Sequence, residues 1–267
     1  MDAGYNQNMT TPKKTEHCMI CGERLNNLSV AENRCCSYCG TTHQAHASCP
    51  RGHFVCDACH GKEVRKMIGD TVLAASSQDP VELAELMMAH PGLPMLSCDH
   101  AFIAAGALLA ALRNSPYGSR FGEAEVREVF DRTAKQAHGG FCGLTGVCGI
   151  APAVGSVVSL FLDSRCGADR EQMIVMEAVG RVNKVIIDLT GPSCCKAYVR
   201  GAVAEAVAFF AEKFGIILPV RKSAVICSHA SKHPHGCREE RCPFFRKPSR
   251  DIFAEAGFLP GTTSCIT

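Results

Sequence analysis

Apolar residues recur with helical spacing through the middle of this chain. Several stretches between residues 62 and 214 carry apolar side chains three or four positions apart, which is the pattern of helices with one buried face. The predicted helices span residues 62–77, 80–90, 99–113, 122–137, 151–162, 171–189 and 195–214. The alternation of apolar and polar residues that is typical of strands is nearly absent. The sequence therefore predicts a mainly α fold with a helical domain over residues 62–220.

Some of these helices carry more specific signals. Asp79 and Pro80 fit the N-cap and the first turn of the second helix. The segment 151–162 is almost wholly apolar and is expected to be buried on all sides. Val182 lies within an apolar stripe on the helix 171–189, which predicts that its side chain is in the core.

Cysteine-rich segments flank the helical domain. The predicted organisation is a disordered tail (1–16), a zinc-binding module (17–61), the helical domain (62–220), a cysteine-rich metal-binding segment (221–247) and a C-terminal tail (248–267). The two tails are predicted from their position at the ends of the chain and, for the first, from its polar composition.

Composition narrows the classes of function. The chain has 267 residues, of which 46% are hydrophobic, enough for a sizeable core. A net charge of +2 without a dense stripe of Lys and Arg argues against nucleic acid as a partner. The sequence shows neither a membrane span nor a signal peptide, so we expect a cytoplasmic protein. In a reducing compartment, eighteen cysteines indicate metal or redox chemistry rather than disulfides, and an anaerobe would tolerate them most easily.

The cysteines before residue 60 are spaced as zinc ligands. A CxxC pair forms a tight turn that presents two thiolates to one tetrahedral ion. In the simplest assignment one zinc ion is bound by Cys18, Cys21, Cys36 and Cys39, and a second by Cys49, His53, Cys56 and Cys59. An interleaved, cross-braced assignment stays open, as does replacement of a ligand by His43, His46 or His60. Cys35 is interpreted as a bystander.

A second set of cysteines lies at breaks between the predicted helices. Cys142 and Cys148 occur in a glycine-rich stretch, FCGLTGVCGIAPAVG. Cys194 and Cys195 follow Gly-Pro-Ser at a helix start, where Ser193 can cap the helix and where the free backbone N–H groups and Lys196 would favour the thiolate.

The last three cysteines of this set lie near the C-terminus. Cys227, Cys237 and Cys242 are unevenly spaced and the last is followed by proline, which is typical of iron–sulfur ligation. His229, His233 and His235 lie between them and would equally suit zinc. We predict that at least four of seven thiols converge on one metal or cluster: Cys142, Cys148, Cys194, Cys195, Cys227, Cys237 and Cys242.

These motifs together resemble a known family. They are CSYCG (36–40), GHFVCDACH (52–60), CGLTGVCGIAPAVG (142–155), GPSCCK (191–196), KFGI (213–216) and the terminal cysteines that end in CPFF at Phe245. The chain resembles an uncharacterised family of cysteine-rich proteins from anaerobic bacteria and archaea, known only as a domain of unknown function. The resemblance covers residues 18–246. It implies a protein partner such as an S-adenosylmethionine-dependent methyltransferase or a redox protein.

Two functions compete on this reading. The first is an iron–sulfur or other thiolate–metal protein, with a [4Fe–4S] cluster or a related centre, in a redox or a sulfur- or methyl-transfer role. The alternative is a zinc-stabilised module that binds another protein without catalysis. No glycine-rich nucleotide loop follows a strand, which argues against a dinucleotide or ATP site.

Overall fold

The computed structural model describes residues 18, 20–21, 23–56, 59, 61–191, 193–220 and 225–245. The predicted tails 1–16 and 248–267 lie outside these residues. The chain divides into two compact units, one up to Lys62 and one from Glu63 onward. The fold is mainly α, as predicted from the helical spacing of apolar residues.

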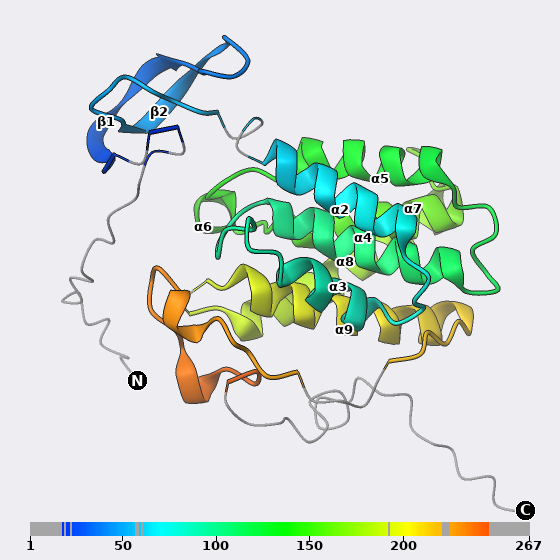
Figure 1. The fold of residues 1–267 in the computed structure, drawn as a ribbon. Coiled ribbons are helices and arrows are strands. Elements are labelled where there is room, and N and C mark those ends of the chain that lie inside the picture. Colours follow the sequence, from blue (N-terminus) through cyan, green and yellow to red (C-terminus); the bar gives the residue numbers. More distant parts are fainter. Residues whose placement is uncertain are drawn as a thin grey trace, which may run out of the picture. The chain divides into compact units, whose positions relative to one another are not determined.

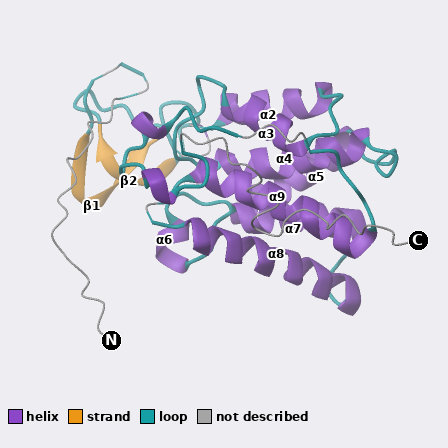
Figure 2. Ribbon diagram, turned by 90° about the horizontal axis from the view of Figure 1, so that it is seen from below, coloured by secondary structure: helices purple, strands orange, loops and turns teal. Residues whose placement is uncertain are grey.

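The N-terminal unit is built on an antiparallel hairpin of two strands (Figure 2). Strand β1 (Asn26–Cys35) pairs with β2 (Thr42–Ser48), with an irregularity in register between Asn27 and Glu32. The sequence did not predict these strands. The reason is that β1 exposes most of its side chains, so it lacks the alternation that marks a strand with one buried face.

The second unit is a bundle of helices whose bounds agree with the predicted ones to within three residues. The helices are α2 (Lys62–Ala74), α3 (Pro80–Met88), α4 (Asp99–Asn114), α5 (Glu123–Gln136), α6 (Phe141–Thr145), α7 (Ile150–Leu162), α8 (Asp169–Leu189) and α9 (Cys195–Phe214). Only the short α6, inside the glycine-rich stretch, was not predicted. As expected, Asp79 caps α3, because its carboxylate accepts hydrogen bonds from the amides of Val81 and Glu82.

Helix α4 forms the centre of this unit (Figure 1). It packs against α3, α5, α7 and α9, and every residue from Asp99 to Leu112 is buried. Six of its residues are alanine, which allows neighbouring helices to approach closely. The apolar helix α7 buries every residue from Ile150 to Val158 except Pro152, which is half buried, and its last turn is half buried as well. The expectation that this helix is buried on all sides is therefore wrong for its last turn.

Glycines permit close contact between α7, α8 and α9. A Cβ atom on Gly155 would lie 2.5 Å from Val179 Cγ2, and one on Gly201 would lie 2.6 Å from Val185 Cγ1. Both distances are below van der Waals contact, so the two helices can approach α8 this closely only where a side chain is missing.

The segment from Val225 to Phe245 packs on the helices instead of extending away from them. It contains the short 3₁₀ turns η1 (Ala230–Lys232) and η2 (Glu239–Arg241), drawn in orange in Figure 1. Phe244 is buried in the same core as the helices, and the amide of Cys227 donates to the carbonyl of Phe244 at 2.7 Å. This bond joins the beginning of the segment to its end and closes a loop. No described helix has the length and apolar character that a membrane crossing requires.

The buried stripe of α8 supports a stability prediction. Val182 is 1% exposed, so Val182→Ala removes two methyl groups from a packed core and should lower the free energy of unfolding by about 1–3 kcal/mol. Met173 on the same helix is 62% exposed, and Met173→Ala should leave stability unchanged. Urea unfolding of both variants measures the difference. Equal midpoints for the two variants would contradict the packing described here.

Candidate metal centres

Two groups of side chains in the N-terminal unit can each hold a metal ion. The first consists of Cys18, Cys21, Cys49 and His53, and the second of Cys36, Cys39, Cys56 and Cys59; within each group the ligand atoms lie within 4.8 Å of one another. The sulfur atoms of Cys21 and Cys49 are 3.5 Å apart, and those of Cys39 and Cys56 are 3.7 Å apart. Tetrahedral coordination by sulfur at about 2.3 Å places the sulfurs about 3.8 Å apart. The donor types and their spacing therefore fit a tetrahedral ion such as zinc.

The grouping of these ligands corrects the simplest assignment made from the sequence. Cys21 does not join Cys36, and the interleaved arrangement is the one observed. The reason is the hairpin, whose shorter strand β2 has seven residues, so the two CxxC pairs at its opposite ends are separated by roughly 20 Å at about 3.3 Å per residue. Because the hairpin is antiparallel, Asn26 lies opposite Ser48, and Cys49 is thereby carried toward Cys18 and Cys21.

Local hydrogen bonds favour the thiolate form within the second group. The amide of Cys56 donates to the sulfur of Cys36 at 3.4 Å, and this bond is the main cause that lowers the pKa of the Cys36 thiol to about 6. The neighbouring Cys35 is exposed, and its thiol donates instead to the carbonyl of Gly40 at 3.3 Å. Cys35 belongs to neither group, which agrees with its interpretation as a bystander.

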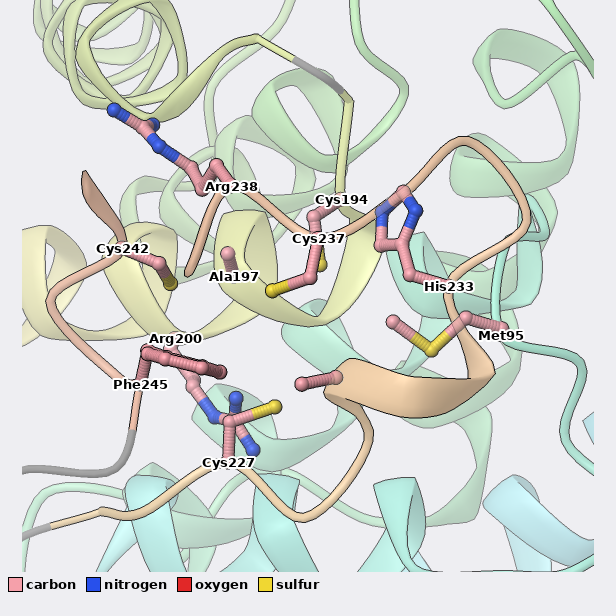
Figure 3. Close-up of a pocket in the computed structure, with 11 residues that line it drawn as sticks. Met95, Cys194, Ala197, Arg200, Cys227, His233, Cys237, Arg238, Cys242 and Phe245 are labelled. Carbon is pink, nitrogen blue, oxygen red and sulfur yellow. The ribbon is translucent and has the colours of Figure 1, made fainter. Parts of the chain in front are cut away.

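In the helical unit, four of the seven candidate thiols line one cavity. They are Cys194, at the start of α9, and Cys227, Cys237 and Cys242 from the C-terminal segment. Figure 3 shows their sulfur atoms pointing into the same space. We call this group the four-thiol cavity. Among the described residues, groups of three or more ligand atoms within 4.8 Å of one another occur only in the N-terminal unit, so these four sulfurs do not form such a group.

Backbone amides donate to two of the four sulfurs. The amide two residues further along the chain donates to the sulfur at Cys227 (from His229, 3.4 Å) and at Cys237 (from Glu239, 3.3 Å). Burial raises the pKa of the Cys242 and Cys194 thiols, and nearby backbone amides partly oppose this effect. Such bonds stabilise thiolates and tune metal–thiolate centres.

One of these donors has an unfavourable backbone conformation. Glu239 has a φ of 47°, which is uncommon for a residue with a side chain. This conformation accompanies the turn in which the Glu239 amide donates to the sulfur of Cys237. Strain of this kind persists where the surrounding structure enforces it, and it concentrates at functional sites.

Buried positive charge lies beside the four-thiol cavity. The guanidinium of Arg200 lines the cavity, is 3% exposed, and binds both carboxylate oxygens of Glu85 at 2.6 and 2.8 Å. Lys196, one helical turn earlier, is 2% exposed and donates to the carbonyl of Met88 at 2.9 Å. Burial, and next the charge of Arg200, lower the pKa of Lys196 to about 8, so it stays mostly protonated at pH 7. The two cations, Arg200 and Lys196, are balanced by one carboxylate, that of Glu85. An anionic metal–thiolate centre in the cavity would compensate the remaining positive charge.

The histidines of the C-terminal segment are poor candidates for ligands of this cavity. His233 lines it, but its Nε2 donates to the carbonyl of Ser193 at 3.0 Å and its Nδ1 accepts from the amide of His235 at 3.2 Å. Neither His229 nor His235 lines the cavity. Thiolates are therefore the donors that this cavity offers to a metal.

The remaining three thiols do not line the four-thiol cavity. Cys142 and Cys148 line a second cavity of about 400 Å³, together with residues of α8 and Tyr198 of α9. Burial raises the pKa of the Cys148 thiol to about 11. Cys195 lines neither cavity.

Two expectations about the start of α9 are also wrong. The N-cap residue is Cys194, not Ser193, and no side chain caps the helix. Burial raises the pKa of the Cys194 thiol and raises that of Cys195 to about 12, although the helix start was expected to favour their thiolates. Desolvation in this buried position outweighs the backbone amides.

Sequence reasoning missed Glu85, Arg200 and Tyr198. A signal for Arg200 was present, because Lys196 and Arg200 are spaced i, i+4 among alanine and valine in α9 and so share a face of an otherwise apolar helix. Charged residues in such a position are rarely buried without a partner or a function. The partner of Arg200, Glu85, is 115 residues away in sequence.

A buried histidine beside these charges supports a prediction about pH. His100 is fully buried, its Nδ1 is 3.1 Å from the carbonyl of Ser97, and its Nε2 has no hydrogen-bond partner. Burial, followed by the charge of Lys196, lowers the pKa of His100 to about 3. The unfolded chain therefore binds a proton below about pH 6.5 that the folded chain does not, and stability should fall by about 1.4 kcal/mol per pH unit down to about pH 3.

Substitution isolates this contribution. His100→Gln should flatten the decrease in stability between pH 7 and pH 5 by about 2 kcal/mol, measured by urea unfolding. His138, which is exposed, provides the control, and His138→Gln should keep the slope of the unsubstituted protein. An unchanged slope in His100→Gln would mean that His100 accepts a proton in the folded protein.

The comparison with known families covers the helical unit. Residues 68–245 match DUF5714, a family of unknown function. The match includes all seven candidate thiols of the helical unit but not the motifs at 36–40 and 52–60. No curated protein and no solved structure matches the chain.

Proposed function

The chain belongs to DUF5714, a family of unknown function, and we propose from its own residues that the helical unit is an iron–sulfur protein. Its cluster ligands are Cys194, Cys227, Cys237 and Cys242. The observation that carries the proposal is that four thiols from two segments line one cavity, and that their sulfur atoms do not form a group within 4.8 Å of one another. In a four-iron cluster each thiolate binds a different iron atom, so its sulfurs lie further apart than those around a single ion.

Three further features support a cluster over zinc. Backbone amides donate to the sulfurs of Cys227 and Cys237. Both nitrogens of His233, the histidine that lines the cavity, are occupied by other hydrogen bonds. The buried cations Arg200 and Lys196 would offset the negative charge that four thiolates bring.

A cluster at this position would serve redox chemistry or a sulfur- or methyl-transfer reaction. When bound, it supplies one-electron transfer. The protein's own part is to bury the centre, to direct amides at its sulfurs and to place Arg200 next to Cys227. A redox protein or a methyltransferase is the proposed partner.

We assign zinc to the two groups of the N-terminal unit. Sulfur-to-sulfur distances of 3.5 and 3.7 Å fit a tetrahedral ion, and each group has four ligands, as structural zinc sites do. This unit is proposed to be folded by its metals, because a small hairpin with exposed faces cannot bury enough apolar surface.

Purification without oxygen tests the cluster. The protein should be brown, with broad visible absorbance from thiolate-to-iron charge transfer, and should contain about four iron and four sulfide per chain together with two zinc ions. Addition of a one-electron reductant should bleach the absorbance and produce an electron paramagnetic resonance signal. A colourless protein that contains zinc alone would contradict the proposal and would favour the second candidate, a zinc-stabilised protein-interaction module.

A further inference from the structure

The second cavity has the features of a reaction site for sulfur chemistry. Its volume is about 400 Å³, within the range of small-molecule sites. Two thiols line it, Cys142 and Cys148, and they differ in access, because Cys142 is exposed whereas Cys148 is 8% exposed. The opposite wall carries polar groups, among them Asn183 and the hydroxyls of Thr190 and Tyr198, which lie 2.8 Å apart.

The segment that carries these thiols is exposed around Cys142. Gly140 and Gly146 flank α6 in left-handed conformations, with φ of 76° at both. A Cβ atom at Gly140, Gly143 or Gly146 would meet nothing within 4 Å, so these positions face open space. Cys148, by contrast, is buried beside the first turn of α7, where its carbonyl accepts the amide of Ala151.

The two cavities share one wall, the first turn of α9. Consecutive residues line opposite sides of this turn, since Cys194 and Ala197 line the four-thiol cavity whereas Ser193 and Tyr198 line the second. The wall is thus one helix thick, about 10–12 Å with its side chains. A thiol pair in the second cavity is placed to exchange electrons with a centre in the first.

We propose that Cys142 and Cys148 form a redox-active dithiol that reduces a small disulfide substrate. This inference rests on the proposed function in one respect, because the cluster supplies the electrons that restore the dithiol. The reaction between the dithiol and the disulfide substrate does not require the cluster. The difference in access assigns the order of attack: the exposed Cys142 reacts first and the buried Cys148 second.

The chemistry balances as thiol–disulfide exchange. The Cys142 thiolate attacks one sulfur of the substrate disulfide, the substrate's S–S bond breaks, and one half leaves as a thiolate that takes a proton. The Cys148 thiol then loses its proton and its sulfur attacks the Cys142 sulfur, which forms the Cys142–Cys148 disulfide. The second half leaves as a thiolate and takes up a proton to become a thiol. The dithiol is oxidised by two electrons and the substrate is reduced by two. The dithiol is restored by two electrons and two protons. The electrons come one at a time from a one-electron donor protein and pass through the neighbouring cluster.

Hydroxyethyl disulfide tests the exchange on the full-length protein purified without oxygen. Differential alkylation and peptide mass spectrometry should locate a Cys142–Cys148 disulfide in the unsubstituted protein, with two equivalents of 2-mercaptoethanol released. Cys148→Ser should trap the mixed disulfide at Cys142, and Cys142→Ser should form neither product. Cys166 is also exposed but lines neither cavity, so it reports the reactivity of an accessible thiol.

The expected result is that Cys142 reacts at least about tenfold faster than Cys166 in the same chain, and that Cys166→Ser behaves as the unsubstituted protein. Equal rates at the two thiols, or a Cys148 that stays reduced in the unsubstituted protein, would overturn the dithiol. Locating the disulfide in the unsubstituted protein requires no variant. The test therefore still holds if a variant fails to fold.

A second measurement separates the dithiol from the cluster. With reduced methyl viologen as the electron donor, the unsubstituted protein should reduce many equivalents of the disulfide. Cys237→Ser, which removes a proposed cluster ligand, should complete one exchange and then stop. If Cys237→Ser turns over as fast as the unsubstituted protein, the electron path through the cluster is wrong. A single exchange in both proteins would show the dithiol to be active without that path.

Discussion

Replacing Cys237 by serine should abolish the visible absorbance of protein purified without oxygen and remove most of its iron. Cys237 is one of four thiols in the cavity, and its sulfur accepts the amide of Glu239. Loss of a residue that hydrogen-bonds to a metal ligand typically lowers metal affinity by about 10–100-fold. Loss of a ligand itself should lower the affinity by more than this. Iron and sulfide analysis together with the visible spectrum measure the effect.

The matched control is Cys166→Ser. Cys166 is exposed, lies between α7 and α8 and lines neither cavity, so this variant should keep the iron and the spectrum of the unsubstituted protein. Circular dichroism should show that both variants retain their helices, since the bundle core is formed by other residues. Full iron content in Cys237→Ser would remove this residue from the ligand set.

Substituting Cys21 by serine should release one of the two metal ions of the N-terminal unit. Structural zinc contributes about 10–16 kcal/mol of binding free energy in small zinc-finger peptides, so loss of a ligand should unfold that end of the hairpin. Residues 18–61 should become sensitive to protease while the helical unit, which is a separate compact unit, stays folded. Cys35→Ser is the control, because Cys35 belongs to neither ligand group and its loss should release no metal.

Double substitutions distinguish the interleaved pairing from the consecutive one. Cys21 and Cys36 lie in different groups, so the variant with both changed to serine should lose both ions in native mass spectrometry. Cys21 and Cys49 share a group, so changing both should lose only one. Consecutive pairing would give the reverse result in each case.

The helices could be predicted from local signals. The spacing of Val182 with its neighbours and the Asp79–Pro80 start of α3 depend only on nearby residues. The strands could not be predicted in this way, because β1 exposes both faces and its position depends on the metal-ligand turns at its ends. The spacing of apolar residues indicates which side chains are buried, so it does not predict the secondary structure of a segment that buries few of them.

The sequence by itself determined the mainly helical fold, the helix ranges and the set of residues able to bind metals, because these depend on local spacing and on donor type. Only the tertiary structure decided which ligands meet. An antiparallel hairpin separates Cys21 from Cys36 and brings Cys49 to Cys21. The first turn of α9 separates the seven thiols into a four-thiol cavity and a second cavity lined by Cys142 and Cys148. Partners such as Arg200 and Glu85 are set by helix packing across more than a hundred residues, which no local pattern encodes.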